Sequence, residues 1–262
     1  MDTRKALPVL LLFAFMLGMI SFPAYAHANE DTAKQIVREM SQYVGSQKTI
    51  ALSFESSIEI ITPQLEKIQF TNSGDALLQR PNKLRAHRWG GYADVYMYFD
   101  GITVSVYGEH INKYARFDAP GSVDDLIHLL REGHGISLPG SDLLLGDSFP
   151  LLMADVIEAK YIGRGVINGV ECEHLAFRNF ETDWQLWVEA GEKPIPRKMV
   201  VTSKTMNSAP QYSITIKDWK TNVDPTTEDF VFIPPIDAKK IKETELIEFD
   251  ELPPEVQGDE NQ

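Results

Sequence analysis

The stretch VYMYFDGITVSVY, residues 95–107, decides the fold class, because it has the pattern of a β-hairpin. Val95, Met97 and Phe99 alternate with tyrosines, and a period of two places successive side chains on opposite faces of a strand. Asp100-Gly101 supplies a two-residue turn between the two runs. The stretch therefore predicts two neighbouring strands that pair antiparallel.

The same signals recur along most of the chain. In IALSFESSIEI, residues 50–60, the apolar side chains share one face, and Pro63 ends or kinks the run. Asn168-Gly169 is a second hairpin turn, between strands predicted at 156–167 and 170–180. Further strands are predicted at 65–79, from Lys83 onward, at 184–189, 197–204 and 212–219, with a last short strand in DFVFIPP, residues 229–235.

Helical periodicity is confined to a few segments. Residues 32–44 carry apolar side chains at helical spacing. Ser122 and Asp125 have the spacing of a capping box, and Gly133 ends the helix that they begin. The apolar stripe of that helix consists of Val123, Leu126, Ile127 and Leu130. The Gly- and Pro-rich section 133–150 predicts two further helices of one or two turns.

These elements predict an α+β fold with one long antiparallel sheet. Roughly nine to eleven strands joined by turns, with few helices, indicate a sheet that carries its helices on one side. A sheet of this length has to curl or close. If it curls only halfway, the helices must cover its concave face, and a cavity is left beneath them.

The N-terminus has the three parts of a secretory signal peptide. Arg4 and Lys5 form a basic start, residues 7–20 are largely apolar, and small residues follow at cleavage spacing. Cleavage after Ala26 and cleavage after Ala28 both fit this pattern. The sequence thus predicts a signal peptide at 1–26, a periplasmic domain at 27–241 and an acidic, flexible tail at 242–262.

Composition excludes several classes of partner. The formal net charge of -13 argues against nucleic acid or an anionic lipid surface as the main partner. A single cysteine, Cys172, cannot form an internal disulfide, so stability has to come from a hydrophobic core. We expect an exported monomer without a cofactor.

Signatures of catalysis are weak. Ser137 lies in GISLP, which lacks the second glycine of a nucleophile elbow and follows a helix. Cys172 would need a basic neighbour to act as a nucleophile, and a half-buried small side chain is the alternative. Metal binding by the ECEH stretch, residues 171–174, is a weaker interpretation than a solvated strand face. We expect no catalytic and no metal-binding residues, and a hydrolase remains the enzymatic alternative.

Two aromatic residues and a basic segment are candidates for binding. Trp184 and Trp187 point to opposite faces of one strand, so one can pack under a helix while the other lines a groove; ordinary packing of both is the alternative. In LLQRPNKLRAHRW, residues 77–89, Pro81 indicates a sheet edge, a strand start or a bend. The positive charges that follow it are expected on a solvated strand face; they are Lys83, Arg85 and Arg88.

Several of these stretches resemble the LolA/LolB superfamily of periplasmic lipoprotein carriers. The resemblance is carried by QRPNKLRA (79–86), YFDGITVSVYGEHINKYARF (98–117) and FVFIPPIDAKKI (230–241). YIGRGVINGVECEHLAFR (161–178) and DWQLWVEAGEKPIPRKMVVTSK (183–204) are closer still to a family of uncharacterised, predicted periplasmic proteins assigned to that superfamily. The resemblance implies a half-barrel with short helices as a lid over an apolar cavity, and a mouth arginine, Arg80, that bonds to the lid.

A binding module is therefore the leading hypothesis. Its ligand would be an acyl chain, a lipid or a lipoprotein, and the protein would act as a carrier or a sensor. The alternative from another class is a protein-interaction module that senses envelope stress by binding a membrane protein. The predicted ligand-binding residues are Arg80, Leu126, Leu130, Trp184 and Trp187.

Overall fold

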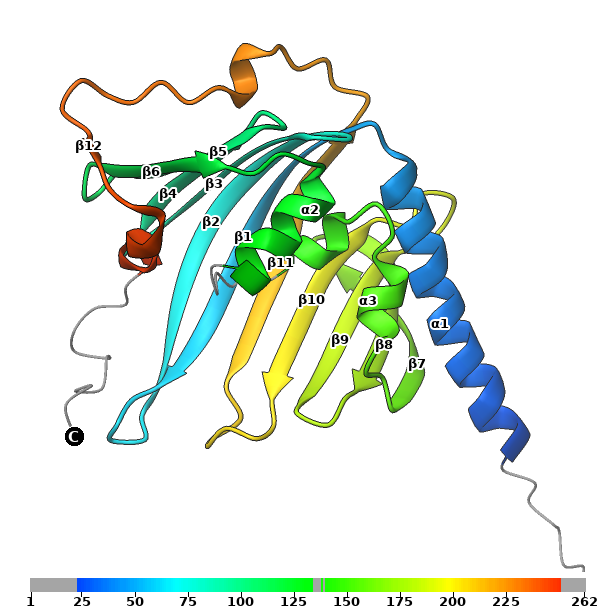
Figure 1. Ribbon diagram of the computed structural model, residues 1–262. Coiled ribbons are helices and arrows are strands. Elements are labelled where there is room, and N and C mark those ends of the chain that lie inside the picture. The colour runs from blue at the N-terminus through cyan, green and yellow to red at the C-terminus, as the bar shows by residue number, and fades with distance from the viewer. Residues whose placement is uncertain (1–22, 134–137, 139, 251–262) are drawn as a thin grey trace, which may run out of the picture.

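The protein is built on one strongly curved sheet. The computed structural model describes residues 23–133, 138 and 140–250. Over these residues the sheet has twelve strands in the order β12-β6-β5-β4-β3-β2-β1-β11-β10-β9-β8-β7 (Figure 1). Neighbouring strands are antiparallel except β12 and β6, which run parallel. The predicted α+β class with a curved antiparallel sheet is confirmed.

The element bounds are as follows. The strands are β1 Thr49–Ile61, β2 Lys67–Gln79, β3 Lys83–Gly90, β4 Asp94–Phe99, β5 Thr103–Gly108, β6 Lys113–Asp118, β7 Glu158–Ile167, β8 Val170–Arg178, β9 Thr182–Glu189, β10 Pro196–Ser203, β11 Gln211–Thr221 and β12 Lys239–Lys240. The helices are α1 Pro23–Ser46, α2 Val123–His128 and α3 Phe149–Met153. Short 3₁₀ helices span Ser141–Leu144, Glu228–Phe230 and Glu243–Asp250, and a π-helical turn, Leu129–Gly133, continues α2.

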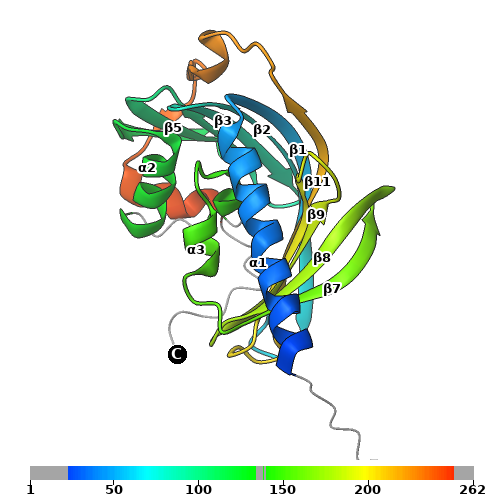
Figure 2. The same ribbon diagram turned by 90° about the vertical axis from the view of Figure 1, so that its right-hand side faces the viewer.

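The helices gather on the concave side of the sheet. In Figure 2 the sheet bends around α2 and α3, and α1 runs along its other end. α1 packs on β7, β8 and β9 through an apolar stripe spaced three or four residues apart, which is fully buried. The stripe consists of Ala33, Val37, Met40 and Val44. α1 thus covers the half of the concave face that α2 does not reach.

The predicted capping box begins α2 and fixes its direction over the sheet. The Asp125 backbone N–H donates to Ser122 Oγ at 3.1 Å, and the Ser122 backbone N–H donates to Asp125 Oδ2 at 2.8 Å. These two bonds satisfy backbone donors that would otherwise lack partners at the helix start. The predicted stripe of α2 then lies buried against the concave face, with Leu126 and Leu130 each 1% exposed.

Strand register decides which side chains face the helices. On β3, Leu84 and Ala86 lie opposite Leu78 and Ala76 of β2, and all four line the concave face. His87, which follows Ala86, bonds to Asp94 at 2.8 Å on the convex face. Because side chains alternate without interruption along β3, one register fixes the face of every residue in the strand.

The predicted last strand in DFVFIPP does not form. A 3₁₀ helix, Glu228–Phe230, occupies its start, and the chain then runs extended across the convex side of β4, β5 and β6 (Figure 1). The Phe232 ring packs against tyrosine rings at centroid distances of 5.5 Å; the tyrosines are Tyr98, Tyr107 and Tyr114. Pro234 and Pro235 cannot donate to a sheet ladder, which explains why side-chain packing replaces strand pairing here.

The first part of the predicted acidic tail packs against the domain. Glu243–Asp250 forms a 3₁₀ helix against β5 and β6, and it buries Leu246 and Phe249 in the core. Two apolar side chains three residues apart give this acidic segment one face that can be buried. The remaining predicted tail, residues 251–262, lies outside the described residues.

The N-terminal prediction falls largely outside the described residues. Of the predicted signal peptide, residues 1–22 are not described, and residues 23–26 form the first turn of α1. Within the described part of the chain, no helix is both long enough and apolar enough to cross a membrane. The division into signal peptide and domain therefore stays a prediction.

The burial of the 243–250 segment can be tested with two matched substitutions. Phe249 is 2% exposed and Phe180 is 82% exposed. We expect Phe249→Ala to lower the free energy of unfolding by an amount near the lower end of about 3–5 kcal/mol, because this side chain borders a cavity. Phe180→Ala should change it by less than about 0.5 kcal/mol. Urea unfolding measures both values, and equal effects would show that the segment does not belong to the core.

Candidate functional site

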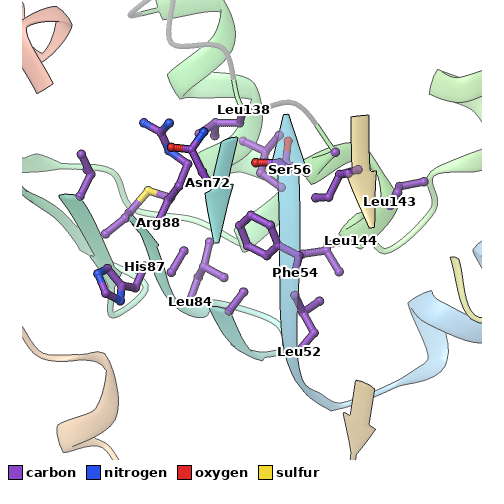
Figure 3. Close-up of a pocket in the computed structure, with 18 of the residues that line it drawn as sticks. Leu52, Phe54, Ser56, Asn72, Leu84, His87, Arg88, Leu138, Leu143 and Leu144 are labelled. Atoms are coloured by element: carbon purple, nitrogen blue, oxygen red, sulfur yellow. The ribbon is translucent and has the colours of Figure 1, made fainter. Parts of the chain in front are cut away.

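A cavity of about 330 Å³ lies between the concave face and the segments that cover it. Its floor is formed by side chains of β1, β2, β3 and β11, and its roof by α2 and residues 138 and 140–144 (Figure 3). Leu246 and Phe249 of the C-terminal 3₁₀ helix close one side. The lining is almost wholly apolar; its leucines are Leu52, Leu78, Leu84, Leu126, Leu130, Leu138, Leu143, Leu144 and Leu246.

Small side chains in the middle of the floor leave this space open. Ala76 of β2 and Ala86 of β3 lie side by side, and neither reaches toward the roof. The Phe54 ring packs directly on the Cα of Gly74. A Cβ atom at position 74 would lie only 2.2 Å from Phe54 Cζ. The Phe54 ring therefore lies close to the backbone of β2. A larger residue at position 74 would displace the ring into the cavity.

One end of the cavity is polar. Ser56, Asn72, Tyr92, Tyr212 and Arg88 line it, and Asn72 Nδ2 donates to Tyr92 Oη at 3.5 Å. Burial raises the pKa of Tyr212 to about 12, while a hydrogen bond with Ser56 and the charge of Arg88 act in the opposite direction. The Tyr212 phenol is consequently protonated at neutral pH.

The structure corrects the predicted location of Arg88. The sequence analysis placed Lys83, Arg85 and Arg88 together on a solvated face. Arg85 does lie on the convex face, 3.5 Å from Asp229, but Arg88 has the opposite strand parity and lines the cavity. The parity that it shares with Leu84 and Ala86 was the signal that could have identified it.

Arg80 connects the floor of the cavity to its roof without lining the cavity. Its Nη2 donates to the Leu144 carbonyl oxygen at 2.6 Å, and its Nη1 lies 3.6 Å from Asp124 Oδ1. Asp124 also accepts from the Gly146 backbone N–H at 2.9 Å. Burial lowers the pKa of the Arg80 guanidinium and the Asp124 charge raises it, but the group stays charged because arginine does not deprotonate in proteins.

The remaining predicted site residues separate into two groups. Leu126 and Leu130 are on the cavity wall. Trp184 stacks on Phe177 at a centroid distance of 4.0 Å, whereas Trp187 stacks on His174 at 4.2 Å on the other face of the sheet. Neither tryptophan lines the cavity, so a role for them in ligand binding stays a prediction without geometric support.

The structure gives the catalytic candidates little support. Cys172 is fully buried, and burial raises the pKa of its thiol, so the reactive thiolate is disfavoured. Ser137 lies outside the described residues. Among the described residues, no group of three or more His, Cys, Asp or Glu side chains could hold a metal ion. In the ECEH stretch, Glu171 and Glu173 instead pair with Arg164 at 2.9 and 3.2 Å.

Comparison with known proteins gives one match of sequence and several of fold. The sequence model of a family described as "Predicted periplasmic protein (DUF2092)" matches residues 33–243. This confirms the kind of family that the sequence resembles. A search of curated proteins finds no match for the chain.

Three similar solved structures are distant from this chain in sequence. An uncharacterized conserved protein from Thermus thermophilus is 9% identical with a TM-score of 0.48, and the match covers 80% of this chain and 99% of that one. LprF from Mycobacterium bovis is 14% identical with a TM-score of 0.43, and the match covers 76% of this chain and 98% of LprF. MucB in the Pseudomonas aeruginosa MucA/MucB complex is 12% identical with a TM-score of 0.43, and the match covers 77% of this chain and 61% of MucB. These likenesses concern the fold alone.

The inert environment of Cys172 leads to a prediction about its reactivity. We expect iodoacetamide to alkylate the native protein at least about tenfold more slowly than the urea-unfolded protein, because burial disfavours the thiolate. Mass spectrometry of samples quenched over time measures both rates. Rapid alkylation of the folded protein would make Cys172 a candidate nucleophile again.

Proposed function

The chain belongs to the family of predicted periplasmic proteins DUF2092, and on that premise we propose that it binds an acyl chain or lipid in the periplasm. The observation that carries the proposal is the apolar cavity of about 330 Å³ beneath α2. Its size falls at the lower end of the range of about 300–1,000 Å³ typical of small-molecule sites.

The chemistry of the walls favours hydrocarbon as the occupant. Leu, Ile, Val, Phe and Ala side chains form most of the surface, and they offer dispersion contacts but no hydrogen bonds. Each methylene group moved from water into such an environment gains about 0.8 kcal/mol. A chain of several methylene groups therefore gains enough to offset its loss of conformational freedom.

The volume favours a single hydrocarbon chain over a lipid with several chains. In this arrangement α2 and residues 138 and 140–144 cover the cavity, and Arg80 holds that cover through Leu144. A whole lipoprotein anchor would require the cover to move outward. A carrier that loads and releases its ligand, or a sensor that reports occupancy, would both use this movement.

Binding of a protein partner is the second candidate, and one observation favours it. Ile233 and Ile236 are exposed on either side of Pro234-Pro235, in the segment that crosses the convex face. Exposed apolar residues that lie close together often mark contact sites for other proteins. A hydrolase that uses Cys172 is not favoured, because this thiol is buried and burial raises its pKa.

Occupancy of the cavity can be tested with an environment-sensitive apolar dye. We expect saturable dye binding to the native protein and displacement of the dye by fatty acids. Ala86→Phe should weaken dye binding by about tenfold or more, because a phenyl ring at this position fills the space above the floor.

Ala176→Phe is the matched control for this substitution. Ala176 is also a half-buried strand residue, but it does not line the cavity. Dye titration by fluorescence measures both variants. If the native protein showed no saturable dye binding, the lipid-binding proposal would fail, and protein binding would become the leading candidate.

The role of Arg80 as a tie between floor and cover gives a second test. Arg80→Leu removes a charge-assisted hydrogen bond, a kind of contact worth about 1.5–3 kcal/mol, so we expect bound dye to dissociate about tenfold faster or more. The fold should persist, because the leucine still packs at a buried position. Arg85→Leu on the convex face should leave the dissociation rate unchanged. Stopped-flow dilution measures the dissociation rate of the dye, and thermal melting shows whether each variant is folded. If Arg80→Leu unfolded, Arg80 would be a structural residue. If the dye dissociated equally fast from Arg80→Leu and the wild type, Arg80 would have no role in holding the cover.

A further inference from the structure

Four turns at one end of the sheet each expose a large apolar side chain. Three of them join β1 to β2, β10 to β11 and β8 to β9, and the fourth leads from α3 into β7. Figure 1 shows the three hairpin tips in a row along the lower edge of the sheet. The exposed residues are Leu65, Ile157, Phe180 and Met206, with exposed fractions between 52% and 82%. We call these four residues the apolar edge.

Strand order and hydrogen bonds between the turns place them side by side. The strands that they serve are neighbours, in the order β2-β1-β11-β10-β9-β8-β7. The Lys204 backbone N–H donates to the Glu181 carbonyl oxygen at 2.9 Å, and the Ile157 N–H donates to the Arg178 carbonyl oxygen at 2.8 Å. Since neighbouring strands lie about 4.8 Å apart, successive hairpin tips are separated by roughly 10 Å.

The opposite end of the same strands has no such row. There the strands are joined by residues 80–82, 168–169 and 190–195, all of which the structure describes. None of these turn residues is an exposed Val, Leu, Ile, Met, Phe or Trp, and Ile195 is buried. Exposed apolar residues scattered singly are normal, whereas their concentration at one end of a fold indicates a contact site.

The β1–β2 turn holds Leu65 in a conformation that leucine rarely adopts. Its φ is 66°, in the left-handed region that favours glycine and asparagine. The Leu65 N–H donates to the Thr62 carbonyl oxygen at 2.8 Å, and the Thr62 N–H donates to the Glu66 carbonyl oxygen at 2.9 Å. Backbone strain of this kind clusters at functional sites. The exposure of Leu65 is therefore part of a well-ordered turn and not a result of loose packing.

An apolar surface connects this edge to the cavity. Ile58 of β1 lines the cavity and pairs with Phe70 of β2. Ile60 and Ile68 form the next pair of the same strand parity, closer to the turn, and all four side chains are half-buried. A hydrophobic ligand that left the cavity at this end would thus cross apolar side chains on its way to Leu65.

Charged side chains near the apolar edge pair with one another. Lys67 lies 3.1 Å from Glu59, and Asp183 lies 3.1 Å from both Lys204 and Arg178. These pairs neutralise the bases nearest the turns, and the chain as a whole has a formal net charge of -13. Because anionic lipid surfaces attract clusters of basic residues, this arrangement favours a zwitterionic lipid surface.

The spacing of the turns favours a bilayer over a protein as the partner. The four side chains come from separate turns, and a bilayer interface has no fixed shape, so it accepts each apolar side chain independently. A protein partner would have to fill the spaces between the turns with a complementary surface. The chain belongs to a family of predicted periplasmic proteins, and the periplasm is bounded by membranes.

We propose that the apolar edge is a membrane-contact site, at which Leu65, Ile157, Phe180 and Met206 insert into the interface of a zwitterionic bilayer. This inference goes beyond the proposed function, because it does not depend on what the cavity binds. It would give a hydrophobic ligand a short route between the membrane and the cavity.

Flotation with dioleoylphosphatidylcholine vesicles tests the proposal. We expect the wild type to bind these vesicles, and the combined substitution of Leu65→Ser, Phe180→Ser and Met206→Ser to lower the partition coefficient at least about tenfold, because membrane affinity scales with the apolar area inserted. Partial replacement of the lipid by phosphatidylglycerol should not strengthen binding. The three positions are exposed, so the variant should melt at the temperature of the wild type.

The matched control combines Ile102→Ser, Ile162→Ser and Val166→Ser. These residues are also more than half exposed, but they lie outside the four turns of the apolar edge. The control should bind vesicles as the wild type does. An equal loss of binding in both variants would mean that general surface hydrophobicity, and not this edge, causes vesicle binding, and the proposal would be wrong.

A fluorescent label reports the site of insertion without removing any apolar side chain. Gln64→Cys lies next to Leu65, and Glu192→Cys lies in a turn at the opposite end; the native Cys172 is buried. With nitrobenzoxadiazole on each new cysteine, vesicles should shift the emission to shorter wavelength at position 64 and leave it unchanged at position 192. This comparison decides the question even if the triple variant is less stable than the wild type.

Three results would overturn the proposal. The first is a wild type that does not float with any vesicles, which would make a protein the occupant of the apolar edge. The second is binding that requires phosphatidylglycerol, since the contact would then be electrostatic. The third is an equal emission shift at positions 64 and 192, which would show that the membrane does not select this end of the sheet.

Discussion

The concave face of the sheet has to be covered, and the rest of the structure follows from this constraint. A sheet of twelve strands curls because each strand twists, and its inner face carries leucine, isoleucine, valine and phenylalanine. Left in water, that face would expose a large apolar area. α1 covers β7, β8 and β9, α2 covers the other half, and the 243–250 segment closes the remaining side. Because the cover consists of separate short elements over small floor residues, it is incomplete, and a cavity is what remains.

The cover is held by different interactions at its two ends. α1 is held by a continuous apolar stripe that is fully buried, which is a strong and permanent kind of contact. The segment around Leu144 is held to the floor by Arg80, whose side chain is 15% exposed and has one carboxylate, Asp124, at 3.6 Å. Polar contacts of this kind can exchange with water when the segment moves, whereas a buried apolar stripe cannot. The fold therefore holds α1 by apolar packing and the Leu144 segment by polar contacts.

Strand parity distributes the charged side chains of β3 between the two faces of the sheet. Arg88 is half-buried and lines the cavity together with polar side chains such as Asn72 and Tyr212. The convex face holds many of the other charges of this half of the sheet, where Asp75 and Asp229 accompany Arg85. Strand parity thus places two arginines, three residues apart, on opposite faces of the sheet.

Local patterns in the sequence determined the elements and much of the architecture. Alternation gave the strands, Asp100-Gly101 and Asn168-Gly169 gave hairpins, and Ser122 with Asp125 gave the start of α2, because each of these depends on neighbouring residues only. The stripe of α2 also placed Leu126 and Leu130 against the sheet. Long-range packing decided the rest. It determined whether DFVFIPP pairs as a strand or packs through Phe232, whether Leu246 and Phe249 become buried, and which ring each tryptophan stacks on. The parity that Arg88 shares with Leu84 and Ala86 can be read from the sequence. The cavity that these residues line cannot, because segments far apart in the chain, α2 and residues 243–250, come together to enclose it.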